Sequence, residues 1–349
     1  MKPLVSILIP AYNAQAWIAD TIQSAIRQTW PNKEIIVVDD GSKDGTLAVA
    51  RQFEPAGVQV FSQKNQGAAA ARNKALSLAR GEFIQWLDAD DLLAPDKIAR
   101  QMKIFEDGED RRILVSSSWG SFYHRPYRAK YRETSLWCDL APVEWLRRKL
   151  NENVYMQTGA WLVSRELTTA AGPWNTEMLG DDDGEYFCRV ILACKLVRFV
   201  PEARVMYRWS GPASLSCIGH SRKKMEALFH SMRLHIGYVL SLDDSPRIRS
   251  ACVRYLQTNL QTFHPECPDL VERAQALAKD LGGSLHPVRL SWKFAWIAKP
   301  FGWSSAKRTQ LRYNRYKTRA IGFLDRILFQ IEKTLGHRCN TRNDDAELT

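Results

Sequence analysis

Residues 83–97 read FIQWLDADDLLAPDK and join an apolar run to a cluster of acids. The first five residues are mostly apolar or aromatic, as in a strand that is covered on both faces. Asp88, Asp90 and Asp91 then follow within four positions. Carboxylates this close repel one another unless a positive group lies among them. The stretch therefore predicts a buried strand whose carboxyl end meets a cation or another positive group.

Strand and helix patterns alternate along the first third of the chain. Asn13 is expected to cap the first helix, and Gly67 introduces an Ala-rich helix. Short connections of this kind predict an α/β fold, with a mainly parallel sheet flanked by helices. Ligands of such sheets bind beyond the carboxyl ends of the strands. The apolar runs expected to form strands lie at residues 4–9, 34–39, 58–61 and 83–87.

Each expected strand ends in polar or turn-forming residues: PAYN, DDGSKDGT, QKNQG and DADD. Asp39 or Asp40 can accept a hydrogen bond from a base or a ribose. Lys64, Arg72 and the helix start at Gly67 offer cations and N–H groups that suit a diphosphate. Taken singly, each feature is as well explained by a turn, a helix cap or a solvated charge.

Asp88 and Asp90 are two residues apart, so in an extended chain their carboxylates lie on the same side. Two hard oxygen ligands suit Mg²⁺ or Mn²⁺, with phosphates and water in the remaining positions. By itself the pair is better explained as helix-capping acids that face solvent, because short motifs give many false matches. The neighbouring strand ends are what favour a metal.

In order, these motifs resemble family 2 glycosyltransferases, the inverting nucleotide-sugar transferases with the GT-A fold. The resemblance is strong over residues 4–105. It implies a GT-A, Rossmann-like sheet and a hexosyltransferase-type enzyme that uses a UDP-sugar or another nucleotide-diphosphate sugar. The acceptor would be a hydroxyl on a surface polysaccharide or a lipid-linked glycan. The matching stretches are VSILIPAYNA at 5–14, QTW at 28–30, EIIVVDDGSKDGT at 34–46, NQGAAAARNKAL at 65–76 and GEFIQWLDADDLLAPDKI at 81–98.

The resemblance also assigns roles to single positions. Asp90, with Asp88, would hold the divalent metal, Mn²⁺ or Mg²⁺. The base, ribose and phosphates of the donor would be contacted by Pro10, Ala11, Tyr12, Asn13, Asp39, Asp40, Lys64, Gly67, Arg72, Asp88 and Ala89.

An inverting transfer needs a carboxylate that takes the proton of the acceptor hydroxyl. The family supplies it from an acidic pair at a helix start, and LGDDDGEYFCRVILAC resembles that segment. Aligning Arg189 with the family's arginine places Asp183 on the base and Asp182 on its acidic neighbour. Asp181 and Glu185 are alternatives. All four acids also suit a helix N-terminus on electrostatic grounds alone.

One position departs from the family. Many members carry a histidine three residues after the tyrosine that matches Tyr207, and it can join the metal. This chain has Ser210 there, and His220 lies ten residues further on. We therefore expect no histidine ligand. Either Asp90, the diphosphate and water alone would then hold the metal, or the metal would bind weakly.

Strand patterns vanish after about residue 221, and helical patterns follow at 225–240, 246–263 and 270–281. We expect a catalytic domain at 1–219, with a nucleotide-sugar half at 1–105 and an acceptor half at 106–219. A helical, basic region would then occupy 220–349. A last helix is expected to end at Gly336, and its apolar stripe comprises Ile321, Leu324, Ile327, Leu328, Ile331 and Leu335.

Residues 291–338 hold eleven Lys or Arg against two acids, in a chain of net charge +11. Trp292, Trp296 and Trp303 lie among these cations. Basic and aromatic residues on helices suit an anionic membrane surface. Packing on the catalytic domain or on a second copy explains them equally well. Nucleic acid is a weaker alternative, since no recognition motif is present.

No segment approaches the roughly 20 apolar residues that a membrane-spanning helix needs. The N-terminus does not resemble a signal peptide, and the seven cysteines are scattered without a CxxC pair. We expect a cytoplasmic protein that can associate with the inner face of the membrane. An inactive nucleotide-sugar-binding or scaffold protein is the main alternative. A nucleotidyltransferase is disfavoured because the Gly-rich, basic signature expected after its first strand is absent from this sequence. A processive synthase is disfavoured because the sequence has no QxxRW motif and no predicted membrane span.

Overall fold

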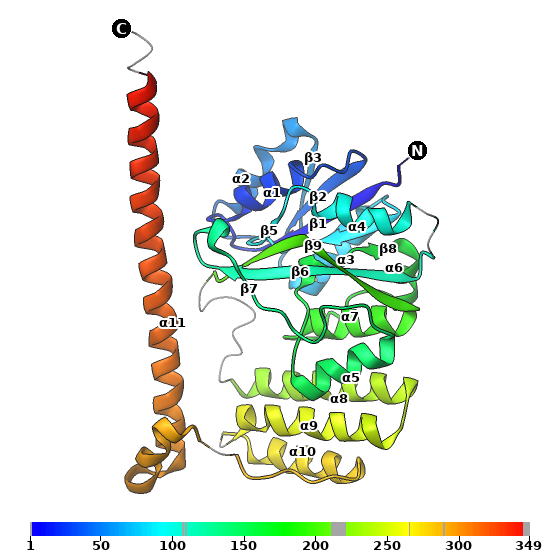
Figure 1. Cartoon of the computed structure of the whole chain (residues 1–349), viewed down its shortest axis with the longest axis vertical. Coiled ribbons are helices and arrows are strands. Elements are labelled where there is room, and N and C mark those ends of the chain that lie inside the picture. Colours follow the sequence, from blue (N-terminus) through cyan, green and yellow to red (C-terminus); the bar gives the residue numbers. More distant parts are fainter. Residues whose placement is uncertain are drawn as a thin grey trace. The chain divides into compact units, whose positions relative to one another are not determined.

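The computed structural model describes residues 2–106, 108, 110–210, 221–264, 266–288 and 290–344 (Figure 1). All four predicted strands are present to within two residues. The elements of the first third alternate as β1 (Val5–Ala11), α1 (Ile18–Ile26), β2 (Lys33–Asp39), α2 (Thr46–Arg51), β3 (Val58–Ser62), α3 (Ala68–Leu78) and β4 (Phe83–Trp86).

The main sheet has the strand order β3-β2-β1-β4-β8, where β8 is Val163–Ser164. Its first four strands are parallel, and β8 pairs with β4 in the antiparallel sense. Every residue of β4 is buried, as its apolar sequence predicts. This mixed α/β fold with a parallel-rich sheet flanked by helices confirms the predicted fold class. A second sheet has the order β5-β9-β6-β7, from β5 (Leu92–Leu93), β9 (Leu196–Arg208), β6 (Ile113–Phe122) and β7 (Lys130–Tyr131).

Two helix boundaries differ from the prediction. Asn13 does not cap α1, which begins at Ile18, because the Asn13 side chain accepts a hydrogen bond from the backbone N–H of Lys43 at 2.8 Å. The last helix, α11 (Trp292–Asp344), continues past Gly336. A single glycine costs a helix only about 1 kcal/mol, and no proline follows to stop it.

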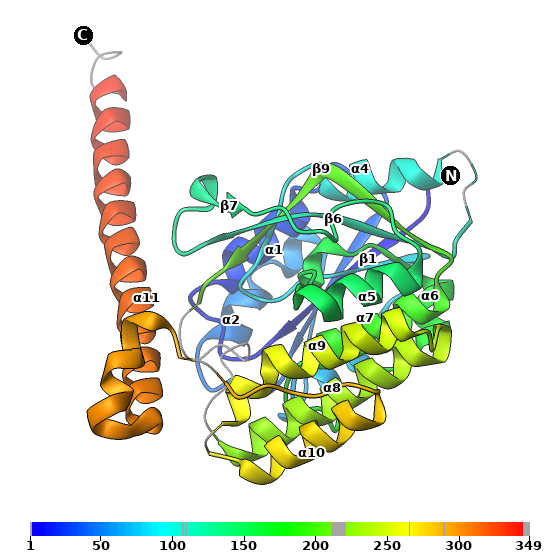
Figure 2. The same cartoon turned by 60° about the horizontal axis from the view of Figure 1, so that its bottom comes forward.

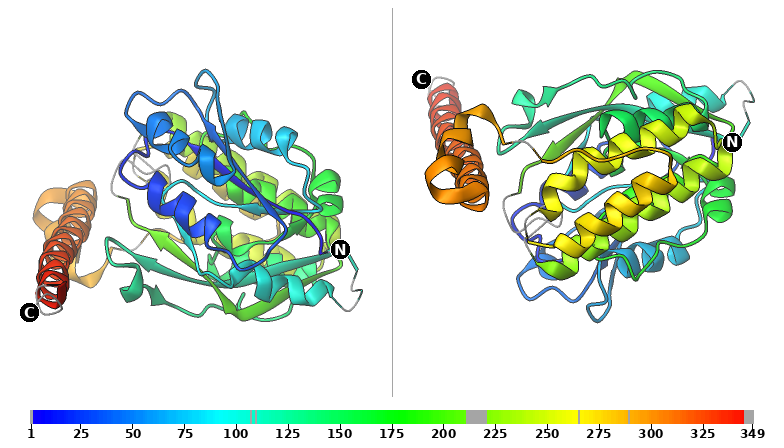
Figure 3. Two further views of the ribbon diagram at one scale, coloured as in Figure 1. Left: turned by 90° about the horizontal axis from the view of Figure 1, so that it is seen from above. Right: turned by 90° about the horizontal axis from the view of Figure 1, so that it is seen from below.

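Helices α5 to α10 follow α4 (Lys97–Met102), and three of them, α8 to α10, form a helical layer. Helix α8 packs against α7, and α9 packs against α5 and α10. Figures 2 and 3 show α8, α9 and α10 side by side. The bounds are α5 (Pro142–Glu152), α6 (Arg165–Ala171), α7 (Asp182–Ala193), α8 (Arg222–Leu242), α9 (Pro246–Phe263) and α10 (Pro268–Asp280).

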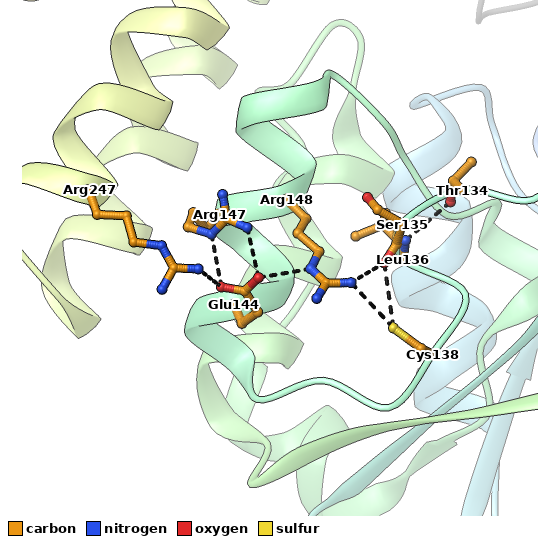
Figure 4. Close-up of polar contacts among 8 residues, drawn as sticks. All are labelled: Thr134, Ser135, Leu136, Cys138, Glu144, Arg147, Arg148 and Arg247. Carbon is orange, nitrogen blue, oxygen red and sulfur yellow. Dashed lines mark hydrogen bonds and ion pairs between the residues drawn. The ribbon is translucent and has the colours of Figure 1, made fainter.

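Glu144 on α5 ties this layer to the rest of the unit (Figure 4). Its carboxylate accepts hydrogen bonds from Arg147 and Arg148 on its own helix, and from Arg247 on α9 at 2.6 Å. The pKa of Glu144 is lowered to about 2, and the hydrogen bond from Arg147 is the largest cause, followed by the contributions of Arg148 and Arg247. The Glu144 carboxylate is therefore ionised at neutral pH, where it can hold the charged hydrogen bond between α5 and α9.

The chain divides into two compact units. Within the described residues, one comprises 2–120, 131–207 and 221–287, and the other comprises 121–130, 208–210 and 288–344. The predicted domain boundary between residues 219 and 220 lies outside the described residues and stays a prediction. Helices α8 to α10 share a unit with the sheets because their apolar faces, including Phe229, Met232, Ile236 and Leu256, are buried within it.

No helix in the described part of the chain is apolar over a length sufficient to cross a membrane. Cys138, Cys188, Cys194, Cys252 and Cys267 are free thiols.

Truncation tests this division of the chain. A chain cut after residue 219 lacks α8–α10 and exposes the faces of α5 and α7 that they cover, whereas a chain cut after residue 287 keeps them. We expect the longer fragment to unfold in one cooperative transition on heating. The shorter one should bind a hydrophobic dye and show no sharp transition. Similar calorimetric traces for the two fragments would contradict the placement of α8–α10.

Candidate active site

The loops after β1 and β2 are fastened to each other. The backbone N–H of Ala14 donates to Thr46 Oγ1 at 2.7 Å, and that of Gln15 donates to Asp44 Oδ2 at 3.2 Å. These contacts fix the end of β1, where the predicted donor-binding residues 10–13 lie. The Tyr12 side chain is 47% exposed, so its ring is available to a ligand.

Asp39 and Asp40 at the end of β2 have different surroundings. The carboxylate of Asp40 accepts hydrogen bonds from the backbone N–H groups of Gln66 and Gly67 at 2.9 and 2.8 Å, so it shapes the loop before α3. Asp39 is buried, and its Oδ2 accepts from the backbone N–H of Ser42 at 3.2 Å. Its Oδ1 has no hydrogen-bond partner among the described residues. A buried acceptor without a donor is costly, so Asp39 is the acid that fits a ligand's N–H or O–H.

The loop after β3 leads into α3 through Gly67, whose φ of 93° favours glycine. The Gly67 N–H is used by Asp40, so a phosphate at this helix would meet the N–H groups that follow. Lys64 in the same loop is exposed. Pro10 and Ala11 lie within β1, and the backbone oxygen of Ala11 accepts from Asp40 N–H at 2.8 Å.

Arg72 on α3 joins two parts of the chain that are far apart in sequence. Its guanidinium donates to Asp88 Oδ1 at 2.8 Å and to Asp182 Oδ2 at 2.7 Å. Its side chain is 7% exposed, and it lies over the Trp174 ring at 4.4 Å from the centroid. Burial alone would lower the pKa of Arg72, but the charges of Asp182 and Asp88 raise it above its usual value.

The three acids after β4 separate into different environments. Asp91 is fully buried and accepts a hydrogen bond from the Gln157 side-chain amide. Asp88 is 28% exposed and paired with Arg72, and Asp90 is partly exposed. Between them, the backbone oxygen of Ala89 accepts from Thr21 Oγ1 at 3.0 Å, which fixes the turn. Arg72 therefore supplies part of the positive charge that was predicted to lie beside this cluster of acids.

Asp183 lies at the start of α7 beside this cluster. Its Oδ2 accepts a hydrogen bond from Thr158 Oγ1 at 3.3 Å. Burial first, and then the negative charges of Asp182 and Asp181, raise the pKa of Asp183 to about 7. Arg72 acts in the opposite direction. The site therefore contains a carboxyl group that can gain or lose a proton near neutral pH.

The alternatives Glu185 and Asp181 are engaged elsewhere. Glu185 is buried, pairs with Arg189 at 2.7 Å, and accepts from Tyr238 on α8 at 2.7 Å. Asp181 accepts from Ser231 on α8 and has a left-handed φ of 57°. Both acids attach α7 to α8, which leaves Asp182 and Asp183 to face the cluster.

Sequence reasoning missed the residues that surround Asp183 from the segment before β8. Thr158 donates a hydrogen bond to Asp183, and Gln157 donates one to Asp91. Tyr155 is 52% exposed and 5.2 Å from the ring of Trp119. Partial loss of contact with water, and then the charges of Asp183 and Asp91, raise the pKa of Tyr155. No local motif marks these positions, because only the chain's return toward β4 brings them there.

Asp88 and Asp90 provide the oxygen ligands that Mg²⁺ and Mn²⁺ prefer. Within the described ranges, no three His, Cys, Asp or Glu side chains gather as a complete metal site. A cation would therefore need phosphate oxygens and water as further ligands, as Mg²⁺ commonly does. Ser210 belongs to the second unit, and His220 lies outside the described residues. The expectation of no histidine ligand stays a prediction.

Comparison with known proteins adds to this geometry. Residues 6–168 match the family model "Glycosyl transferase family 2". The chain is 44% identical over 105 residues to "Putative teichuronic acid biosynthesis glycosyltransferase TuaG" of Bacillus subtilis, covering 29% of this chain and 42% of that protein. It is 44% identical over 98 residues to chondroitin synthase of Escherichia coli, covering 28% of this chain and 14% of that one. The matches span less than half the length of these relatives.

Two solved structures share the fold. TarS of S. aureus in complex with UDP has a TM-score of 0.59 at 16% identity, covering 80% of this chain and 89% of that chain. Mannosyltransferase PcManGT from Pyrobaculum calidifontis, in complex with GDP-Man and Mn²⁺, has a TM-score of 0.51 at 20% identity. That match covers 89% of this chain and 85% of the other.

The parallel sheet with polar strand ends, and these structural neighbours, define a fold of the GT-A glycosyltransferase type. Over residues 6–168, somewhat less than half of its length, the chain is similar to glycosyl transferase family 2.

Replacing Arg72 with Met tests the bridge in this site. The change leaves Asp88 and Asp182 without their shared cation, so we expect a loss of about 2–4 kcal/mol in the free energy of unfolding. This loss of stability is smaller than that expected for breaking a fully buried ion pair, because both carboxylates are partly exposed to solvent. Arg80→Met is the matched control, since Arg80 is 74% exposed and pairs with Glu34. It should cost less than about 1 kcal/mol. Equal urea midpoints for the two variants would contradict a structural role for the bridge.

Proposed function

We propose that this protein is an inverting glycosyltransferase. It would move a hexose from a nucleotide-diphosphate sugar to a hydroxyl of a surface polysaccharide or a lipid-linked glycan. One observation carries the proposal: Arg72 joins Asp88, at the predicted donor side, to Asp182, and the neighbouring Asp183 has a pKa of about 7. A carboxylate poised there can accept a proton from a hydroxyl at neutral pH.

The proposed reaction is a single displacement. The acceptor hydroxyl oxygen attacks the anomeric carbon from the side opposite the diphosphate, and its proton passes to Asp183. The new carbon–oxygen bond forms as the bond to the phosphate oxygen breaks, and the diphosphate leaves with the electron pair. Attack from the opposite side inverts the configuration at the anomeric carbon.

The donor would lie along the strand ends. The unpartnered Oδ1 of Asp39 would accept from the base or the ribose, and the half-exposed Tyr12 ring would lie against the base. Lys64 would face the phosphates. A divalent cation held by Asp90 and Asp88 would neutralise charge on the departing diphosphate. The TarS complex with UDP and the mannosyltransferase complex with GDP-Man and Mn²⁺ support a nucleotide-diphosphate donor, for which we propose a UDP-sugar.

The acceptor would lie against Tyr155. This side chain is half exposed and close enough to Asp183 for that acid's charge to raise its pKa. Sugar rings pack on aromatic faces, and the Trp119 ring supports Tyr155 from one side. A sugar stacked there would present a hydroxyl toward the base. The names of the relatives, teichuronic acid biosynthesis and chondroitin synthase, support a polysaccharide acceptor.

The pH dependence of transfer tests the role of Asp183. A base works when it is ionised, so kcat/KM should rise with pH through about 7 and then level off. Asp183→Asn should lower kcat by roughly 10²–10⁴-fold. Asp96→Asn, an equivalent change at the start of α4, should leave kcat unchanged. A pH profile retained by Asp183→Asn would assign the base to another group.

Stability measurements on the same variant exclude misfolding as the cause. Because folding raises the pKa of Asp183, its contribution to stability is present at low pH and is lost as pH rises through about 7. Asp183→Asn should therefore be at least as stable as wild type above pH 7. The difference in the free energy of unfolding between Asp183→Asn and wild type should narrow toward acid pH.

Calorimetric titration with UDP, dTDP, GDP and CMP, with and without Mn²⁺, tests the donor site. We expect tight binding of one diphosphate, weakened about tenfold by Asp39→Asn through the loss of one hydrogen bond. Asp90→Ala or chelation of the metal should weaken it further, while Asp96→Asn binds as wild type. Nucleotide binding without any sugar transfer would favour the alternative of an inactive binding protein. No binding by folded protein would reject the proposal.

A further inference from the structure

The described residues of the second unit include a helix face whose apolar side chains are exposed. Helix α11 is interrupted at Gly302, where φ is 79° and ψ is 159°, and then continues as a long helix (Figure 1). Large apolar side chains on this part are between 40% and 69% exposed. They are Tyr313, Tyr316, Ile321, Phe323, Leu324, Ile327, Leu328 and Ile331.

Helical geometry places these side chains on one side. At 100° per residue they fall in an arc about 160° wide. Lys317 falls within this arc, and its long stem can lie along an apolar surface while the ammonium stays in water. A narrower arc on another side of the helix has the uncharged Gln330 at its edge and carries six exposed cations: Arg308, Arg312, Arg315, Arg319, Arg326 and Lys333.

A third face of the helix is already occupied within the unit. Arg125, in the segment 121–130, pairs with Asp325 and Glu332 at 2.8 Å each. The backbone N–H of His124 donates to Asp325 at 2.9 Å, and its ring stacks on Phe329. Asp325 and Glu332 are the two acids of residues 291–338. The segment thus neutralises the negative groups and leaves the apolar and basic faces exposed.

The first part of α11 adds exposed aromatic residues. Trp292 and Trp296 are 80% and 66% exposed, and Phe301 is 69% exposed. Lys293 and Lys299 lie between them in the sequence. Tryptophan flanked by lysine favours the boundary between water and lipid, where the ring contacts the acyl region and the cation meets headgroups.

We propose that α11 binds the surface of an anionic membrane, with its apolar face in the lipid boundary and its cations attracted by the headgroups. The apolar arc is wider than the seam of a two-stranded coiled coil, and the net charge of +9 over 291–338 would repel a second copy. Nucleic acid would be contacted by the basic face and would leave the apolar face in water. A lipid surface accounts for both faces at once.

Flotation of the full chain with lipid vesicles tests this binding. We expect binding to vesicles that mix phosphatidylcholine with phosphatidylglycerol, and little binding to phosphatidylcholine alone. Added salt should weaken it. Arg315→Gln and Arg319→Gln should each reduce the affinity by roughly fivefold.

Two further variants isolate the apolar face. Leu324→Glu and Gln330→Glu add the same charge to exposed positions of the same helix, but only Leu324 lies in the apolar arc. Leu324→Glu should reduce binding to anionic vesicles by at least about tenfold more than Gln330→Glu does, because it also removes an apolar side chain that the lipid would bury. Circular dichroism should show unchanged helix content for both variants.

Three results would overturn the proposal. The first is the absence of binding to anionic vesicles. The second is equal binding by Leu324→Glu and Gln330→Glu. The third is wild-type self-association, seen by analytical ultracentrifugation, that Leu324→Glu abolishes while vesicle binding is unaffected, which would assign the apolar face to a second copy. None of these results depends on donor binding or transfer, so the proposed function is tested separately.

Discussion

The buried guanidinium of Arg72 is the contact on which the candidate site depends. It bonds Asp88 after β4 and Asp182 at the start of α7, two residues separated by almost a hundred positions. Without a cation between them, these carboxylates would repel each other in partly desolvated surroundings. With it, Asp183 is brought beside the cluster, where burial and its acidic neighbours raise its pKa to about 7. The ion-pair network thus joins the two segments, while burial and the acidic neighbours raise the pKa of Asp183.

The helical layer supports this arrangement from the other side of α7. Glu185 and Asp181 are bonded by Tyr238 and Ser231 of α8, so the first turn of α7 cannot rotate freely. Helices α8 to α10 therefore belong to the unit that contains the site and are not a separate appendage. The region with a distinct character is the final helix, whose exposed apolar face suits a surface outside the chain.

Local patterns predicted the strands and their polar ends well, since period, length and turn residues are properties of short segments. They placed Asp39, Arg72 and Asp88 among the candidate site residues, and the resemblance to the family added Asp183. They could not separate Asp39 from Asp40. The Asp40 carboxylate accepts hydrogen bonds from loop N–H groups, while Asp39 Oδ1 has no partner among the described residues. That distinction depends on the path of the loop after β3, which no feature of β2 encodes locally.

By itself, the sequence determined the α/β alternation, the acid-rich strand ends and the basic, amphipathic character of the last helix, because each follows from residues close along the chain. Tertiary structure decided which charges meet. Arg72 selects Asp88 and Asp182, Asp91 turns inward to Gln157, and Thr158 reaches Asp183. The physical reason is that burial and charge proximity, which set pKa values and pairing, act through space between segments that the chain order keeps apart.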